Sequence, residues 1–272
     1  MNIFYAIILG IIQGLTEFLP ISSTAHLTLA GKYFGLIDPA RPEDWTAFIA
    51  IMQLGTVAAV IIFFFKDLIL MTRSFFTDLL KQKSSERWTY ESKLAWKIIL
   101  GTIPVVIIGL AFKDIVEGTF TKEISTIATS LIVLALILLL AEKIGKKLRG
   151  ERQTTWFDAL VVGFAQALAL IPGSSRSGTT ITAGLFLGLT RETAARFSFL
   201  LSIPAVLASG FYEMYGARHH FADLGIAPLI VSTVVSGIVG YWAISFLLKF
   251  LQKHTTYVFI FYRIILGAVL WG

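Results

Sequence analysis

The sequence predicts an all-α polytopic membrane protein with two inverted-topology repeats, each a re-entrant helix–loop–helix followed by three transmembrane helices. Composition, an internal repeat and the placement of basic residues predict this class. Of the 272 residues, 56% are hydrophobic and 15% are charged, and the mean hydropathy is +0.78. Soluble domains carry about 25% charged residues. Stretches such as 124–141 and 227–248 are apolar for long enough to cross the roughly 30 Å hydrocarbon core as helices.

Composition also excludes several kinds of site. The chain has no cysteine, so disulfides, thiol chemistry and thiolate metal sites are excluded. The N-terminus lacks a basic stretch and a small-residue cleavage site, so we expect no removable signal peptide. The net charge of +6 is typical of a membrane protein whose cytoplasmic loops are rich in Lys and Arg, and we expect no nucleic-acid partner.

Residues 4–36 and 157–188 are two copies of one segment. The first reads FYAIILGIIQGLTEFLPISSTAHLTLAGKYFGL and the second reads FDALVVGFAQALALIPGSSRSGTTITAGLFLG. When one residue is dropped before the proline, the aligned pairs are Phe4 and Phe157, Gly10 and Gly163, Gln13 and Gln166, Pro20 and Pro172, Ser22 and Ser174, Ser23 and Ser175, and Phe34 and Phe186. The copies place a first repeat at 1–150 and a second at 151–272.

Each copy predicts a re-entrant hairpin. Its two apolar arms are shorter than the ~20 residues that a spanning helix needs, and a tip rich in Pro and Ser separates them. Non-helical backbone at membrane depth is tolerated only where it is buried in protein or lines a wet cavity. We therefore expect hairpins at 1–36 and 157–190.

The basic residues indicate which loops face the cytoplasm. Loops 66–97, 142–158 and 249–254 hold 7, 5 and 2 Lys or Arg, whereas loops 31–45, 113–123 and 211–226 hold 2, 2 and 1. If the first set is cytoplasmic, six spans follow, at about 46–65, 98–112, 124–141, 193–212, 227–248 and 257–271. The second hairpin must then return to the cytoplasm, while the first hairpin and both termini face outside. The two tips are expected to meet near the middle of the membrane, as in inverted-repeat transporters.

The first tip carries a carboxylate, hydroxyls and an imidazole. An ionisable residue inside an apolar segment is costly, which makes Glu17 a functional candidate. Gln13 lies on the same helix face, four residues earlier, and suits either a ligand contact or a hydrogen bond between helices. His26 follows the tip closely enough to reach its serine hydroxyls. These hydroxyls belong to Ser22, Ser23 and Thr24, and either serine also suits a helix N-cap.

The second tip is suited to hold an anion. Its small residues let backbone N–H groups approach an oxyanion, and the start of a helix adds positive potential. Arg176 supplies a planar fork that binds phosphate through two hydrogen bonds. The residues expected to form this anion site are Gly173, Ser174, Ser175, Arg176, Ser177 and Thr180. Arg263 is different, because it lies near the cytoplasmic end of the last span and is expected to snorkel to the interface.

The two tips together suit phosphoryl transfer, in which catalysis is mostly positioning and charge stabilisation. EFLPISSTAH and IPGSSRSGTT closely resemble the two signature regions of the undecaprenyl-pyrophosphate phosphatases, the bacitracin-resistance family. The resemblance continues through PVVIIGLAF, FSFLLSIP and FIFYRIILG. It implies a multi-pass protein of the bacterial inner membrane, with its active site open to the periplasm. It also implies hydrolysis of undecaprenyl pyrophosphate to undecaprenyl phosphate and inorganic phosphate, which recycles the lipid carrier of peptidoglycan synthesis and confers bacitracin resistance.

The resemblance also assigns site residues. Matched by motif, Glu17 is the second acid of a Glu/Gln-x-x-x-Glu pattern, Ser23 and His26 belong to the first tip, and Ser175, Arg176 and Thr180 belong to PGxSRSxxT. A divalent cation, Mg²⁺ or Ca²⁺, is implied by the family alone, with Glu17 as its candidate ligand. Gln13 stands where other members have Glu, which leaves one carboxylate fewer for a metal. The sequence leaves the oligomeric state open.

Three groups are candidates for the attack on phosphorus: the Ser23 hydroxyl, the His26 imidazole and a water held by Glu17. A serine is a weak nucleophile until a neighbouring base takes its proton. Both His26 and Glu17 are near Ser23 in the sequence. We favour Ser23 as nucleophile, with His26 as its base or as the acid toward the leaving lipid phosphate.

A lipid flippase or transporter is the alternative to an enzyme, because inverted repeats with broken helices are typical of transporters. A third hypothesis is that the polar tips only join helices. A flippase needs recognition but no nucleophile. Phosphate release from lipid pyrophosphate by purified protein in detergent, without a second compartment, would distinguish the enzyme from the flippase.

The predicted topology is testable because the chain has no native cysteine. In intact cells, an impermeant maleimide should label a cysteine placed in loop 31–45 and leave Gly150→Cys unlabelled. Gly150→Cys should react only after the cells are broken open. Labelling of position 150 from outside intact cells would show that the charge-based topology is wrong.

Overall fold

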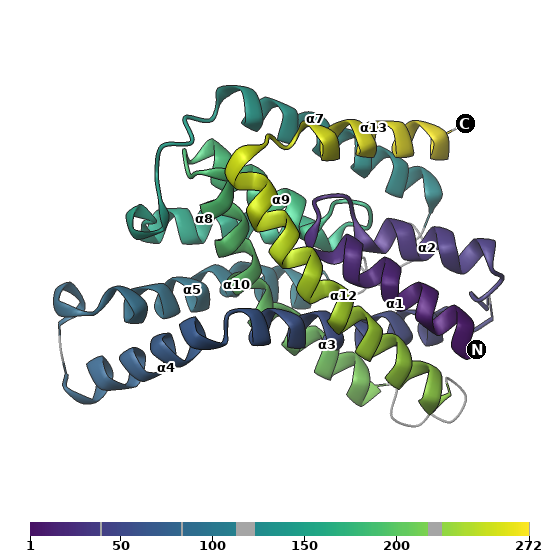
Figure 1. The fold of residues 1–272 in the computed structure, drawn as a ribbon, viewed down its shortest axis with the longest axis horizontal. Helices are drawn as coiled ribbons and strands as arrows, with labels where there is room; N and C mark the ends of the chain where they lie inside the picture. Colours follow the sequence, from purple (N-terminus) through teal and green to yellow (C-terminus); the bar gives the residue numbers. More distant parts are fainter. Residues whose placement is uncertain (39, 83, 113–122, 217–224, 272) are drawn as a thin grey trace.

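The computed structural model describes residues 1–38, 40–82, 84–112, 123–216 and 225–271. The fold is a bundle of helices (Figure 1). The helices are α1 Ile3–Phe18, α2 Ser23–Tyr33, α3 Pro42–Phe63, α4 Phe65–Leu80, α5 Tyr90–Ala111, α7 Ile124–Ile144, α8 Trp156–Ala167, α9 Arg176–Phe186, α10 Arg191–Gly216, α12 Ile226–Lys253 and α13 Tyr257–Trp271. Short 3₁₀ turns lie at Ser85–Arg87, Glu151–Gln153 and Leu168–Leu170, the last of which extends α8.

Within the described residues, five helices are long and apolar enough to cross a membrane, which confirms a multi-pass membrane protein. They cover Asp44–Phe63, Tyr90–Ala111, Ile124–Ile144, Arg191–Gly216 and Ile226–Lys253. The sixth expected span, 257–271, is α13, and its 15 residues make it shorter than the usual span of about 20. The expected outer loop at 113–123 lies almost wholly outside the described residues, as does 217–224 of the loop at 211–226.

The segment 66–97 is not an irregular loop. It forms α4, which starts directly after α3, and the beginning of α5, which starts at Tyr90 rather than near 98. In Figure 1 the paired α4 and α5 project from the bundle at the end opposite to both termini. Counting charges along a segment locates loops, but it does not distinguish coil from a helix with a polar face.

The two predicted hairpins are present as α1–α2 and α8–α9, and their turns share an unusual backbone. Ser22 and Ser175 each cap the helix that follows, with φ of 74° and 65°. Each serine hydroxyl accepts a hydrogen bond from the backbone N–H three residues later, at Ala25 and Gly178. A left-handed backbone is rare for a residue with a Cβ. Its presence at both tips indicates that the two turns are built alike.

The two hairpins also end alike. After α2 and α9, Gly35 and Gly188 adopt φ of 64° and 82°, which stops the helix at a residue without a Cβ. Backbone bonds from Leu36 to the Gly31 carbonyl and from Leu189 to the Gly184 carbonyl close both ends. At both ends of the two helices, the matching residues are 153 sequence positions apart, so the two copies align here without a gap. The aligned pairs at the tips are therefore Ser22 with Ser175 and Ser23 with Arg176, so dropping a residue before the proline was wrong there.

Each hairpin packs against a helix from the other half of the chain. Helix α1 lies along α12, and α8 lies along α5. Glycines permit both contacts: a Cβ on Gly14 would lie 2.8 Å from the Ser236 carbonyl oxygen, and one on Gly163 would lie 2.3 Å from the Gly101 carbonyl oxygen. Small residues of this kind let membrane helices approach closely.

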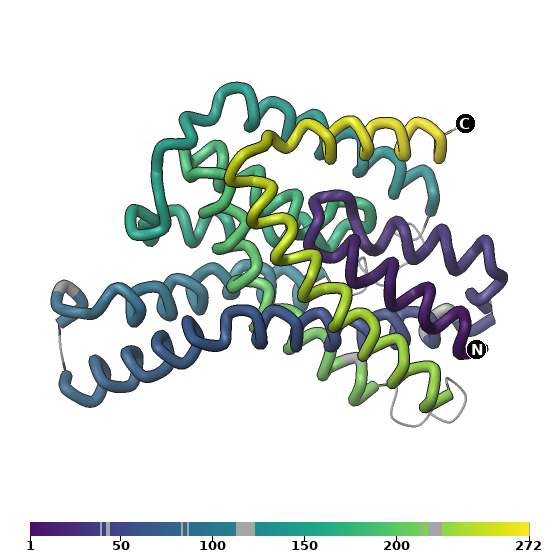
Figure 2. Tube along the Cα trace, in the orientation of Figure 1, coloured from purple at the N-terminus to yellow at the C-terminus, as the bar shows by residue number. Residues whose placement is uncertain are grey.

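The hairpins approach the middle of the bundle from opposite ends. Figure 2 shows the turn of α1–α2 and the turn of α8–α9 near the centre of the molecule, while both termini lie at the same end. A hydrogen bond of 3.1 Å from the Ser177 hydroxyl to the Leu19 carbonyl joins the two turns. The orientation of each half relative to the membrane stays a prediction.

Candidate active site

Glu17 is the centre of the polar cluster between the tips. It is 7% exposed at the end of α1, and its carboxylate accepts hydrogen bonds from three side chains. Gln13 Nε2 donates to Oε2 at 2.9 Å, and Ser23 Oγ donates to the same oxygen at 2.7 Å. The Arg176 Nη2 group pairs with Oε1. These three donors satisfy the hydrogen-bonding capacity of a carboxylate that is otherwise costly to bury.

Arg176 crosses from the second tip to the first. Its side chain comes from the first residue of α9, and one end of its fork forms the ion pair with Glu17. The other end, Nη1, is buried and has no hydrogen-bond partner. An unpaired guanidinium N–H in a buried place is a donor that an anionic ligand can use. Arg176 is therefore at a tip, as expected, and is paired inside the bundle.

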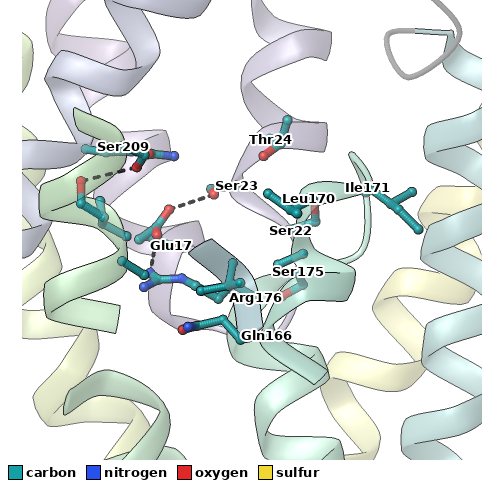
Figure 3. Close-up of a pocket in the computed structure, with 16 residues that line it drawn as sticks. Glu17, Ser22, Ser23, Thr24, Gln166, Leu170, Ile171, Ser175, Arg176 and Ser209 are labelled. Carbon is teal, nitrogen blue, oxygen red and sulfur yellow. Dashed lines mark hydrogen bonds and ion pairs between the residues drawn. The ribbon is translucent and has the colours of Figure 1, made fainter. Parts of the chain in front are cut away.

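A cavity of about 190 Å³ opens at this cluster (Figure 3). Its polar lining includes Glu17, Ser22, Ser23, Thr24, Gln53, Gln166, Ser175, Arg176 and Ser209, and the backbone at Gly173 also contributes. The two tips thus face one shared space, which can hold a small polar group. Elements from both halves of the chain build it.

His26 does not contact Ser23. Its Nδ1 donates to the Ser22 carbonyl at 2.7 Å, since a carbonyl only accepts, and its Nε2 is bonded to the Tyr262 hydroxyl at 2.6 Å. The His26 and Tyr262 rings are also stacked, with an interplanar angle of 8°. Both ring nitrogens are therefore occupied, and His26 is not among the residues that line the cavity. The expectation that His26 is the base for Ser23 does not fit this arrangement, because Glu17 makes that contact.

Arg263 does not snorkel, which corrects the expectation from sequence. It is 0% exposed, and its Nη2 donates to the carbonyls of Ser174 and Gly173 at 3.0 and 3.4 Å. The preceding carbonyl, at Pro172, accepts from the Ser130 hydroxyl at 2.6 Å. Donors from α7 and α13 thus hold three successive carbonyls of the second tip, and these bonds offset part of the cost of burying Arg263.

The hydroxyls of the predicted anion site have different places. Ser22 and Ser175 line the cavity but also cap their helices. Ser177 binds the first tip through Leu19. Thr180 is fully buried, and its hydroxyl bonds to the Arg176 carbonyl at 2.7 Å and to Ser198.

Three further residues of the predicted site also have distinct positions. Ser174 is buried beside a second, apolar cavity, where its hydroxyl has no partner. Gln13, also fully buried, acts through Glu17. At Gly173, with φ of 89°, a Cβ would come within 2.1 Å of the Ser130 hydroxyl, so no other residue fits this turn.

Sequence reasoning missed Gln166 as a residue of the site. It is 1% exposed and lines the cavity, yet neither its side-chain nitrogen nor its oxygen has a partner. The repeat held the signal, because Gln166 pairs with Gln13. Gln53 and Ser209, from α3 and α10, were also missed, and no motif in the sequence marks them.

The described residues do not form a divalent-cation site by themselves. No group of three or more His, Asp or Glu side chains suited to a metal occurs among them. In the part of the chain that the structure describes, Glu17 is the single carboxylate lining the cavity, and both of its oxygens are already bonded to protein donors. Mg²⁺ and Ca²⁺ take six or more oxygen ligands, of which waters and substrate phosphates commonly supply several, so this donor set alone does not complete a coordination shell.

The fold and the site define an integral membrane protein with an internal site for phosphoryl chemistry. A carboxylate hydrogen-bonded to a serine hydroxyl can activate it, and an arginine beside them can stabilise phosphate charge. Comparison with known proteins agrees. The chain belongs to the family described as bacitracin resistance protein BacA, which matches residues 6–269.

Similar proteins in several bacteria match along their whole length. The chain is 51% identical to a protein of Syntrophobacter fumaroxidans over 100% of this chain and 97% of that protein. It is 50% identical to one of Chloroherpeton thalassium, over 99% and 96%, and 50% identical to one of Chlorobium phaeobacteroides, over 100% and 97%. Each of the three is named undecaprenyl-diphosphatase.

The geometry of Arg176 predicts that its fork is required. Arg176→Lys keeps the charge, but one ammonium cannot both pair with Glu17 and present a second donor to the cavity. We expect phosphate release from polyprenyl pyrophosphate in detergent to fall about 10- to 100-fold, the loss typical of a hydrogen bond to a charged group. Arg152→Lys, an exposed arginine outside the cavity, is the control. Near-wild-type turnover of Arg176→Lys would show that a point charge is sufficient.

Proposed function

We propose that this chain hydrolyses undecaprenyl pyrophosphate to undecaprenyl phosphate and inorganic phosphate, regenerating the lipid carrier of peptidoglycan synthesis and conferring bacitracin resistance. The observation that carries the proposal is the Ser23–Glu17–Arg176 cluster in a cavity between the tips (Figure 3). The names of the similar proteins support the substrate. A polyprenyl chain keeps the substrate in the bilayer, where the cavity lies between membrane helices.

In the first step, Glu17 takes the proton of the Ser23 hydroxyl. The hydrogen bond of 2.7 Å is already in place for this transfer. The Ser23 oxygen then bonds to the terminal phosphorus, and the bond from that phosphorus to the bridging oxygen breaks. The electron pair leaves with the bridging oxygen, so undecaprenyl phosphate is the leaving group. Arg176 stabilises the charge that spreads over the phosphoryl oxygens.

Arg176 has to serve two partners in this scheme. Without substrate it pairs with Glu17. A pyrophosphate carries more negative charge than Glu17 and competes for the same guanidinium. When Arg176 turns to the substrate, Glu17 keeps its hydrogen bond with Ser23. Substrate binding therefore releases Glu17 from the ion pair and leaves its carboxylate beside the Ser23 hydroxyl.

In the second step, water attacks the phosphoserine. Glu17 holds the proton that it took from Ser23, and this proton returns to the Ser23 oxygen as the bond to phosphorus breaks. Water supplies one oxygen and both of its protons to the inorganic phosphate, which leaves as the dihydrogen form, so the serine and the carboxylate are both restored. Thr24 and Ser175, which line the same cavity, are placed to hydrogen-bond the phosphoryl oxygens.

The proposed location is the bacterial inner membrane, with the cavity open to the periplasmic side. Under the charge-based topology, the outer halves of α3, α5 and α10 face the periplasm. These halves supply the cavity residues Gln53, Val105, Val206 and Ser209. The position of the cavity therefore supports access from outside.

The nucleophile is tested by comparing Ser23→Ala with Ser22→Ala. We expect Ser23→Ala to reduce phosphate release by more than about 10⁴-fold, beyond the contribution typical of one proton-transfer group. Ser22→Ala should be milder, because the hydroxyl it removes is a helix cap worth about 1 kcal/mol. Acid quench of a single turnover should yield a phosphopeptide containing Ser23. A Ser23→Ala protein that works at a near-normal rate would move the attack to water or His26.

We further propose that a divalent cation enters with the substrate, since the pyrophosphate oxygens supply ligands that the protein lacks. We expect EDTA to abolish turnover and Glu17→Gln to do the same, while Gln13→Ala is milder. Calorimetry with Mg²⁺ alone should detect no binding to the protein, and Mg²⁺ should bind once a polyprenyl pyrophosphate is present. Tight Mg²⁺ binding to the ligand-free protein that Glu17→Gln removes would contradict this proposal.

A further inference from the structure

Of the described residues in the cavity wall, Gln166 has the most buried polar side-chain atoms without a hydrogen-bond partner. The side chain is 1% exposed, yet both of its polar atoms lack partners among the residues that the structure describes. Burying an amide without hydrogen bonds is unfavourable. Because the side chain lines the cavity, a ligand in that cavity can satisfy it.

The repeat explains why Gln166 is left unpaired. In the first hairpin, Gln13 donates to the carboxylate of Glu17, one helical turn later. In the second hairpin, the residue four positions after Gln166 is Leu170, which offers no acceptor. The second copy therefore keeps the amide donor and lacks the carboxylate. A carboxylate at position 170 would repel a second anionic group of the substrate. Leucine at this position therefore suits a site that holds such a group.

A second free donor accompanies Gln166. The Arg176 Nη1 group is buried without a partner, while Nη2 of the same guanidinium pairs with Glu17. In the view of Figure 3, Arg176 lies between Glu17 on one side and Gln166 on the other. The guanidinium thus has one end at the Ser23–Glu17 side of the cavity and one end unused.

We propose that Gln166 and Arg176 Nη1 form a subsite for the lipid-linked phosphate of the substrate. This inference rests on the proposed function. Release of inorganic phosphate requires attack at the terminal phosphorus, so the terminal phosphate lies beside Ser23. The other phosphate, which carries the lipid, then lies toward Gln166, and Arg176 bridges the two. The amide nitrogen donates to this phosphate, and the amide oxygen accepts from Arg176 once the guanidinium has left Glu17.

The subsite accounts for a preference for lipid diphosphates over lipid monophosphates. A lipid monophosphate fills only the Gln166 side and presents no phosphorus to Ser23. The same subsite stabilises the leaving group, because negative charge moves to the lipid-linked phosphate as the bridging bond breaks. Gln166 therefore binds the part of the substrate that becomes the lipid product.

Product inhibition tests the subsite, because the two products occupy different sides of the cavity: the lipid monophosphate lies at the subsite, and inorganic phosphate lies beside Ser23. In Gln166→Leu, we expect kcat/KM for polyprenyl pyrophosphate to fall about 10- to 100-fold. The inhibition constant of a polyprenyl monophosphate of the same chain length should rise by a similar factor, while that of inorganic phosphate should stay within about twofold. Gln166→Glu has the same size and adds a negative charge, so it should weaken monophosphate inhibition further.

Gln252→Leu is the matched control, because Gln252 is exposed and bonds to Glu192 away from the cavity. Thermal unfolding in detergent checks that each variant is folded. If Gln166→Leu and Gln166→Glu keep the wild-type monophosphate inhibition constant, or if they raise the constants of both products equally, the subsite is refuted. Wild-type protein without any phosphatase activity would instead refute the proposed function.

Discussion

The buried ion pair between Glu17 and Arg176 is the interaction on which the arrangement of the tips depends. Its two partners are 159 residues apart in the sequence, and each lies at the end of a helix that stops inside the bundle. Burying both charges is costly, and removing one partner of such a pair typically costs about 3–5 kcal/mol. Helix α1 therefore has to end where α9 begins. The bond from Ser177 to Leu19 fixes the same contact with neutral groups. The contact that builds the site is thus also the contact that holds the two hairpin tips together.

The last helix holds both tips in place through neighbouring residues. Tyr262 bonds and stacks with His26 at the start of α2, while Arg263 binds the carbonyls of the second tip. Helix α13 itself packs along α7, whose Ser130 binds Pro172. This support leaves the cavity-facing groups Gln166 and Arg176 Nη1 available to a ligand, beside the Ser23 hydroxyl that is bonded to Glu17. Preorganised donors of this kind need little rearrangement when charge develops.

Much of the fold could be predicted from the sequence, because hydrophobic length and a visible repeat determine where helices and hairpins lie. The repeat also predicts that Glu17 and Arg176 lie close together, since it places both tips at the same depth. Side-chain partners could not be predicted in this way. His26 was placed beside Ser23 by spacing along one helix, but Tyr262, 236 residues away, decides where its ring points. Arg263 was judged by its distance from a span end, although the carbonyls that bind it belong to another helix pair. The role of Gln166 was not evident from its place in the repeat, because a buried polar side chain without a hydrogen-bond partner can be recognised only in three dimensions.

Because each hairpin packs against a helix from the other half of the chain, the order of synthesis affects how the protein assembles. Helix α1 enters the membrane first, with Gln13 and Glu17 on it, but its packing partner α12 begins at Ile226. Arg176 and Arg263 are also synthesised late. For most of translation, the first hairpin therefore has a carboxylate in or near lipid and a glycine face without a partner. Polar residues in this position are expensive, so an early hairpin would be held at the surface or by the insertion machinery. Assembly of this membrane protein can finish only when its last helices have arrived, because each half packs its hairpin against a helix of the other half.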